Sequence, residues 1–153
     1  AEVQAAHRPH SIGLCDIDHF KAINDTHGHN VGDRVLKMVA SVLQESCGGH
    51  LVARIGGEEF VVLFEGLAPS AAAELLNQAR DALGRRNFRV RETDEPLGRI
   101  SFSAGVAWSG GGRDGDTTLQ RADELLYDAK HSGRNQVRGE GIATDPYPVL
   151  TAC

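Results

Sequence analysis

Arg54-Ile55-Gly56-Gly57-Glu58-Glu59-Phe60 joins two apolar runs, residues 51–55 and 60–64. Apolar runs connected by a short glycine-containing segment are typical of a β-hairpin. Glycine takes positive φ without steric cost and lets another molecule approach the backbone closely. We therefore predict a hairpin whose turn presents two glycines followed by two glutamates.

Strand and helix patterns alternate on both sides of this hairpin. The predicted strands cover residues 11–17, 88–91, 99–108 and 135–138. A short helix is predicted over residues 18–25, and longer helices are predicted to start near residues 30, 69 and 117, the first of them stopped by Gly48-Gly49 and the last by Gly133. Asn30 and Thr117 are the expected N-caps of the second and fourth helices. This order predicts an α/β (α+β) domain in which helices cover a mixed sheet.

The composition is that of one globular domain, since the 153 residues are 41% hydrophobic and 24% charged. A net charge of -5 argues against binding to long nucleic acids, although a small anionic ligand needs only a local basic cluster. The three cysteines are widely spaced and predict neither a disulfide framework nor a zinc site.

Neither a membrane span nor a signal peptide is evident in the sequence. We therefore expect a cytoplasmic domain without membrane contact of its own, although the full-length protein could be membrane-attached. Residues 1–10 are expected to form an irregular lead-in, residues 11–138 the functional domain, and residues 139–153 a loosely attached tail.

Acidic residues end two of the predicted strands, with Asp16 and Asp18 after the first and Glu58-Glu59 at the hairpin turn. Carboxylates at neighbouring strand ends can share a hard cation such as Mg²⁺. A pair of such cations can activate a hydroxyl and stabilise a leaving phosphate. On spacing alone, acids that only mark exposed turns are an equal alternative.

Larger blocks of sequence decide between these alternatives. The first runs from Asp16-Ile17-Asp18 to Asn24-Asp25, the second from Gly28 to Asp33, and the third from Arg54 to Phe60, with further blocks at residues 99–107 and 121–135. Together they resemble the signature blocks of the diguanylate cyclase, or GGDEF, family over residues 11–138, with Glu58 in place of the family's Asp. The resemblance implies a mainly antiparallel five-stranded sheet flanked by helices, similar to nucleotidyl cyclases and polymerase palms.

The resemblance also implies an enzyme, a diguanylate cyclase that condenses two GTP molecules into cyclic di-GMP and two pyrophosphates. Each 3′-hydroxyl would attack the α-phosphate of the other GTP, with Mg²⁺ or Mn²⁺ as cofactor, two ions in each active site. Because one domain holds one GTP, catalysis would require a homodimer. The segment that usually leads into this domain is absent, so we expect a missing N-terminal regulatory region.

Roles for individual residues follow from the resemblance. The expected metal ligands are Asp16, the carbonyl of Ile17, Glu58 and Glu59. Glu58 is the preferred catalytic residue for deprotonation of the 3′-hydroxyl, with Glu59 as its competitor, and Asp18 is expected to be solvated or to act as a cap. The expected substrate-binding groups are the backbone N–H groups of His19 and Phe20, the side chains of Lys21, Lys130 and Arg134 at the triphosphate, Asn24 and Asp33 at guanine, and His29, Gly56 and Gly57 near the nucleotide.

The chain departs from the family's usual pattern at one motif. Many members carry an Arg-x-x-Asp product-inhibition motif where this chain has Cys47-Gly48-Gly49-His50, so we predict no allosteric inhibitory site.

Two other functions stay open. A catalytically weak GGDEF module could act as a receptor for GTP or cyclic di-GMP, but the metal ligands favour turnover. A nucleotidyl cyclase or polymerase-like enzyme could prefer another base, but Asn24 with Asp33 favours guanine.

Overall fold

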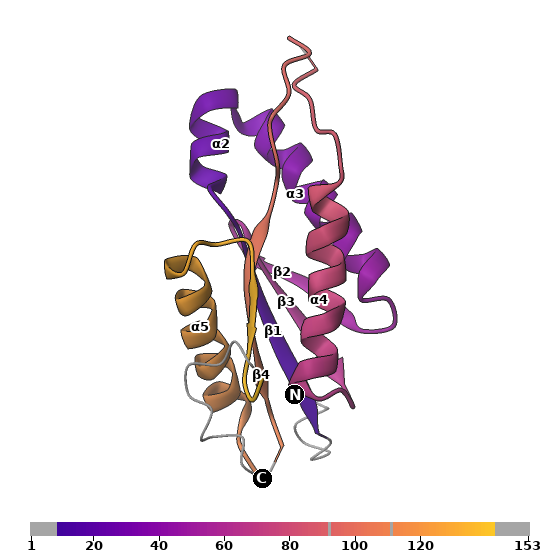
Figure 1. The fold of residues 1–153 in the computed structure, drawn as a ribbon, viewed down its shortest axis with the longest axis vertical. Coiled ribbons are helices and arrows are strands. Elements are labelled where there is room, and N and C mark those ends of the chain that lie inside the picture. The colour runs from indigo at the N-terminus through magenta and orange to yellow at the C-terminus, as the bar shows by residue number, and fades with distance from the viewer. Residues whose placement is uncertain (1–8, 92, 111, 143–153) are drawn as a thin grey trace.

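The structure, a computed structural model, describes residues 9–91, 93–110 and 112–142. Within these residues, five strands form one sheet in the order β2-β3-β1-β4-β5 (Figure 1). The strands are β1 (His10–Ile17), β2 (Leu51–Gly56), β3 (Glu59–Glu65), β4 (Phe102–Trp108) and β5 (Val137–Gly139). β1 pairs antiparallel with β3 and β4, β2 pairs antiparallel with β3, and β5 is parallel to β4. This arrangement confirms the predicted mixed, mainly antiparallel sheet.

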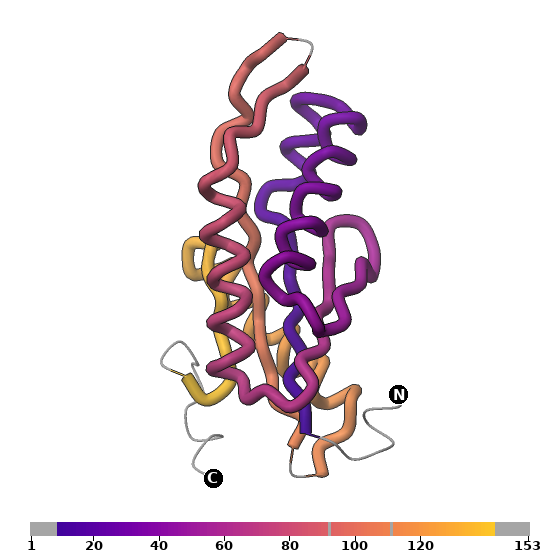
Figure 2. The backbone as a smooth tube through the Cα atoms, turned by 90° about the vertical axis from the view of Figure 1, so that its right-hand side faces the viewer, coloured from indigo at the N-terminus to yellow at the C-terminus, as the bar shows by residue number. Residues whose placement is uncertain are grey.

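Helices cover both faces of the sheet. The helices are α2 (Phe20–His27), α3 (His29–Ser46), α4 (Pro69–Gly84) and α5 (Gly115–His131). α3 and α4 pack against each other on one face and α5 lies on the other, while α2 packs on α3 beyond the end of β1 (Figures 1 and 2). The apolar residues of α4 recur every three or four positions, which gives the helix one core-facing stripe.

The core is correspondingly divided by the sheet. The larger cluster lies between the sheet and α3 and α4, and a smaller one, formed by Leu14, Ala107, Ala122 and Leu126, lies beneath α5. A Cβ atom at Gly105 of β4 would collide with the backbone of α5, so glycine allows this close approach. α5 is thereby fixed directly on the central strands.

Two predicted helix starts were wrong. α3 begins at His29, one residue before the predicted cap Asn30, because Gly28 at φ 90° makes the turn and its carbonyl accepts the first helical bond from Gly32. α5 is capped by Asp114, whose carboxylate accepts a hydrogen bond from the Thr117 amide at 2.7 Å. Thr117 is thus the third helical residue rather than the cap.

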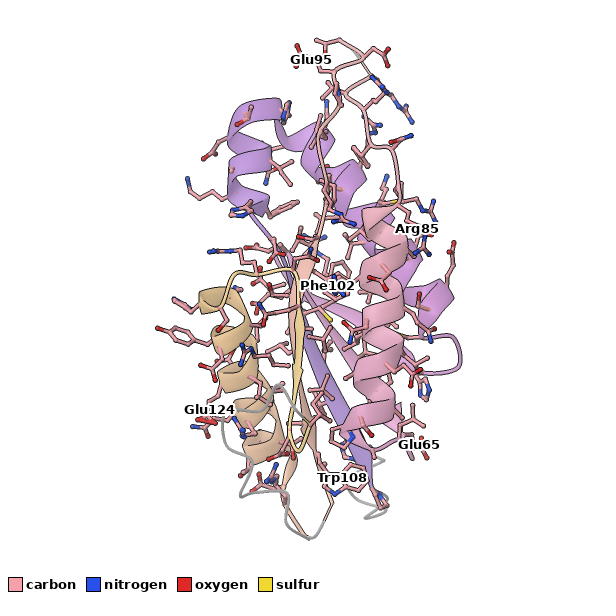
Figure 3. The ribbon with its side chains drawn as sticks, in the orientation of Figure 1. Glu65, Arg85, Glu95, Phe102, Trp108 and Glu124 are labelled. Atoms are coloured by element: carbon pink, nitrogen blue, oxygen red, sulfur yellow. The ribbon has the colours of Figure 1, made fainter. Side chains whose placement is uncertain are left out.

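The segment between α4 and β4 also differs from its prediction. Residues 88–91 make only an isolated bridge, Arg89 to Pro96, and β4 begins at Phe102 rather than at residue 99. This segment projects from the body of the domain, with Glu95 at its tip, Phe102 near the middle of the molecule and Trp108 at the other end of β4 (Figure 3).

The chain ends are described only in part. Residues 1–8 of the predicted lead-in and 143–153 of the predicted tail lie outside the described residues. Within the described part, Glu140 is buried and accepts hydrogen bonds from Arg113 at 2.7 Å and from the Trp108 amide at 3.0 Å. None of the described helices is both long and apolar enough to span a bilayer.

Candidate active site

Strand pairing brings the predicted acidic residues together. In the register of β1 with β3, Asp16 is the partner of Glu59, and the Ile17 amide donates a hydrogen bond to the Glu58 carbonyl at 3.2 Å. Paired residues of adjacent strands point to the same face of a sheet. Two carboxylates more than forty residues apart in sequence therefore lie side by side.

This arrangement is electrostatically unfavourable by itself. Burial raises the pKa of Asp16, and the neighbouring charges of Glu58 and Asp18 raise it further, against an opposing effect of Lys130. The pKa of Glu59 is raised by burial first and then by the charge of Asp16. Crowded carboxylates of this kind are typical of functional sites, where a bound cation relieves the repulsion.

Lys130 provides the positive charge of the cluster. Its Nζ atom lies 2.8 Å from Oδ2 of Asp16, and it extends from the last turn of α5, which packs on β1 and β4. The predicted phosphate-binding lysine therefore lies beside the predicted metal ligands.

The hairpin turn holds Glu58 next to this pair. Gly57 has φ 43°, a left-handed conformation that glycine adopts readily, and its carbonyl accepts a hydrogen bond from Nε of Arg54 at 2.9 Å. The sequence alone assigned no role to Arg54. Its position within the Arg-Ile-Gly-Gly block was the only signal of it.

The expected guanine-binding residues lie at the junction of α2 and α3. Oδ1 of Asn24 is buried and has no hydrogen-bond partner among the described residues. It lies against Gly32, where an added Cβ would collide with it, and Asp33 is the next residue and is exposed. A buried acceptor without a partner is costly, so a side-chain rotation that brings the Asn24 amide to a ligand would relieve that cost.

The expected phosphate-binding groups are only partly brought together. His19 is left-handed at φ 57° and precedes Phe20, the first residue of α2. Arg134 is left-handed at φ 61° and exposed. Lys21 is directed elsewhere, because its fully exposed ammonium pairs with Asp25 at 2.8 Å. His29 begins α3 and is exposed.

Asp18 was expected to be solvated or to act as a cap, and this was wrong. It is only 6% exposed, and its carboxylate accepts hydrogen bonds from the hydroxyls of Ser101 and Ser103 and from the Asn135 amide. Its partners lie more than eighty residues away in sequence, so no local pattern could have identified them.

Residues 47–50 occupy the position where many family members carry the Arg-x-x-Asp motif, and here they contain a buried cysteine and a histidine in contact with an aromatic ring. Cys47 is buried as the C-cap of α3, and burial raises the pKa of its thiol to about 11. The His50 ring is tilted against Phe64, with 5.3 Å between ring centroids. The absence of an inhibitory site stays a prediction.

The donor set at the strand ends suits a divalent cation. Among the described residues, no group of three or more histidine, cysteine or acidic side chains already converges as a cation cage. Mg²⁺ usually takes one or two carboxylates and completes its coordination with water and phosphate oxygens, so the Asp16 and Glu59 pair fits it.

Comparison with known proteins agrees with this geometry. Residues 1–136 match the family described as diguanylate cyclase, GGDEF domain. The chain is 41% identical to diguanylate cyclase DgcP of Pseudomonas aeruginosa over 127 residues, which cover 82% of this chain and 18% of the relative. It thus spans less than a fifth of that protein's length.

Solved structures share the fold. The GGDEF domain of DgcB from Caulobacter crescentus, in complex with c-di-GMP, superposes with a TM-score of 0.84 at 39% identity, covering 90% of this chain and 81% of that one. The active GGEEF domain of a diguanylate cyclase from Vibrio cholerae gives a TM-score of 0.79 at 34% identity, covering 90% and 86%. By sequence and by fold, the chain belongs to the diguanylate cyclase, GGDEF domain, family.

Proposed function

We propose that this chain is the catalytic domain of a diguanylate cyclase, which converts two GTP molecules into cyclic di-GMP and two pyrophosphates. The observation that carries the proposal is the alignment of Asp16 with Glu59 across β1 and β3, with Lys130 bonded to Asp16. Names of the relatives support it, since they include a diguanylate cyclase and an active GGEEF domain.

Diguanylate cyclases of this family are generally dependent on divalent metals. In this chain, Asp16, the Ile17 carbonyl, Glu58 and Glu59 would hold Mg²⁺ or Mn²⁺, with two ions in the active site. Such cations lower the pKa of an attacking hydroxyl and neutralise charge on the phosphates.

One of the two glutamates of the hairpin would also accept the proton of the attacking 3′-hydroxyl. The 3′-hydroxyl of one GTP would attack the α-phosphorus of the other, the bond from that phosphorus to the bridging oxygen would break, and pyrophosphate would leave. The same reaction with the two roles exchanged would close the ring and release the second pyrophosphate. Glu58 is our choice to accept the hydroxyl proton because it lies in the turn, whereas Glu59, the alternative, is held in β3.

Two groups of residues would bind GTP, one at the guanine base and one at the triphosphate. The carboxylate of Asp33 would accept hydrogen bonds from the N1 and N2 donors of guanine, and the Asn24 amide, once turned from its buried position, would offer both a donor and an acceptor to the base. Lys130, Arg134 and the backbone N–H groups of His19 and Phe20 would bind the triphosphate, with Lys21 able to swing from its exposed position.

Two domains must face each other for the reaction. The described part of one domain offers one acidic pair and one proposed guanine site, so the two subunits of a two-fold dimer would each supply one reacting nucleotide.

A direct test separates this enzyme from a receptor. The domain is incubated at high concentration with GTP and Mg²⁺, and the products are analysed by mass spectrometry. We expect cyclic di-GMP and pyrophosphate, and loss of both in a Glu58→Ala, Glu59→Ala variant. GTP binding without any product would instead support the receptor function.

A further inference from the structure

Asp18 joins three separate segments of the domain next to the candidate active site. Its amide donates to the Ser101 carbonyl at 2.9 Å. Its Oδ2 atom accepts from the Ser101 hydroxyl at 2.6 Å and from the Asn135 amide at 3.0 Å, and its Oδ1 atom accepts from the Ser103 hydroxyl at 2.7 Å. One buried carboxylate therefore links the end of β1, the start of β4 and the turn after α5.

The turn after α5 needs such support because its backbone is strained. Arg134 and Asn135 have φ 61° and 49°, and His19, next to Asp18, has φ 57°. Non-glycine residues in this region cost on the order of 1 kcal/mol or more each, and they persist only where surrounding contacts hold them.

A second contact holds the same turn from the opposite face of the sheet. Nη1 of Arg80 on α4 donates to Oδ1 of Asn135 at 3.0 Å, and Nε of Arg80 donates to Asn77 at 3.2 Å. The backbone amide of Asn135 thus donates to Asp18, and its side-chain oxygen accepts from Arg80. Its position depends on α4 and β1 together, which fixes the turn relative to the sheet.

The supported turn carries the expected phosphate-binding groups. Arg134 lies within the turn, and Lys130 lies just before it in the last turn of α5, where it reaches Asp16, two residues before Asp18. We propose that Asp18 is a positioning residue that holds the turn of residues 132–135 so that Arg134 and Lys130 are placed for the triphosphate of GTP. This inference rests on the proposed function and adds to it a residue that does not itself contact the nucleotide.

Replacing Asp18 by asparagine or by alanine distinguishes a positioning role from a role that needs the negative charge. An asparagine at position 18 can keep its amide oxygen on the Asn135 amide and the Ser101 hydroxyl, while its NH₂ group faces Ser103, whose hydroxyl can turn to accept. An alanine removes every side-chain contact and keeps only the backbone bond to the Ser101 carbonyl. A positioning role therefore survives Asp18→Asn and is lost in Asp18→Ala, whereas a role that needs the negative charge, such as metal binding, is lost in both.

The experiment compares wild type with Asp18→Asn, Asp18→Ala and Ser103→Ala, and uses Glu74→Ala, an exposed acid on α4, as the matched control. Affinities for GTP and for GMP are measured by calorimetry with Mg²⁺, and amide exchange of residues 132–138 is followed by mass spectrometry. In Asp18→Ala we expect about a tenfold loss of GTP affinity, a smaller loss for GMP, which lacks the β- and γ-phosphates, and faster exchange in the turn.

Asp18→Asn and the control should stay within about threefold of wild type in GTP affinity. Ser103→Ala should change both readouts in the same direction as Asp18→Ala but by less, and it decides the matter if Asp18→Ala does not fold. Equal loss of GTP and GMP affinity, unchanged exchange, or failure of Asp18→Asn to restore GTP binding would overturn the positioning role alone. A wild-type domain that binds no GTP would overturn the proposed function, and the role of Asp18 with it.

Discussion

Glu59 is held in an environment that disfavours its charge. Its pKa is raised by burial and by Asp16, so its ionisation opposes folding. For an acid whose pKa is raised on folding, the stabilising contribution is present below the unfolded value and is lost as pH rises through the raised value.

We therefore predict that Glu59→Gln abolishes cyclic di-GMP synthesis and yet stabilises the domain at neutral pH. The expected rise in melting temperature is on the order of 1–2 °C, and it should shrink as the pH falls below the ordinary glutamate range. Thermal melts across this pH range measure it, with the exposed Glu74→Gln as control. A variant that is less stable than wild type at neutral pH would contradict the prediction.

A substitution at Gly32 is expected to affect ligand binding at the proposed guanine site, Asn24 with Asp33, much more than it affects folding. In Gly32→Ala, the new Cβ would displace the Asn24 side chain and press on the ring of Phe20 at 3.3 Å, while alanine favours the helix by up to about 1 kcal/mol. Because these effects on stability oppose each other, we expect little net change in stability and at least tenfold weaker GTP binding. Calorimetry and thermal melts measure the two effects. Gly48→Ala, whose Cβ would make only an ordinary contact, should leave GTP binding unchanged.

At the scale of elements, α5 carries Lys130 in its last turn, beside Asp16. Its start depends on the cap that Asp114 gives to Thr117, and this hydrogen bond lowers the pKa of Asp114. A depressed pKa contributes stability that is present above the unfolded value and is lost as the pH falls through the folded value.

We predict that Asp114→Ala lowers the melting temperature by a few degrees at neutral pH and that the difference from wild type disappears in strong acid. Calorimetric scans at the two pH values measure this. Asp116→Ala, which removes an acid in the same first turn, should have a smaller effect because the cap hydrogen bond is made by Asp114. Equal effects of both variants would show that the cap is not responsible.

At the scale of the whole molecule, the described residues hold one acidic pair, Asp16 with Glu59, and one proposed guanine site, Asn24 with Asp33. If two copies supply the two nucleotides, activity per domain should rise with domain concentration until the dimer is saturated. Initial rates measured over a hundredfold range of domain concentration at saturating GTP test this. A constant rate per domain over that range would show either a pre-formed dimer or a single-domain reaction, and sedimentation at the same concentrations distinguishes the two.

Much of the architecture could be predicted from the sequence because its causes are local. The glycine-containing turn between apolar runs predicted β2 and β3, and the spacing of apolar residues predicted α3, α4 and α5. The helix caps were less predictable, since Asp114 and Thr117 both suit an N-cap and only backbone geometry distinguishes them. The residue roles in the site came from the resemblance of ordered blocks to a family.

Contacts between distant segments were decided only by the tertiary structure. Lys130 lies 114 residues from Asp16, and Asn135 lies 117 residues from Asp18, so no window of sequence contains either pair. Their meeting depends on the register of β1 with its neighbours and on the close approach of α5 to Gly105. The sequence by itself determined most of the elements, because propensity and periodicity act between neighbouring residues, and its ordered blocks indicated the expected chemistry through their resemblance to a family. Packing alone decided that Asp18 is buried and supports a strained turn, because its hydrogen-bond donors meet only when β1, β4 and α5 are assembled.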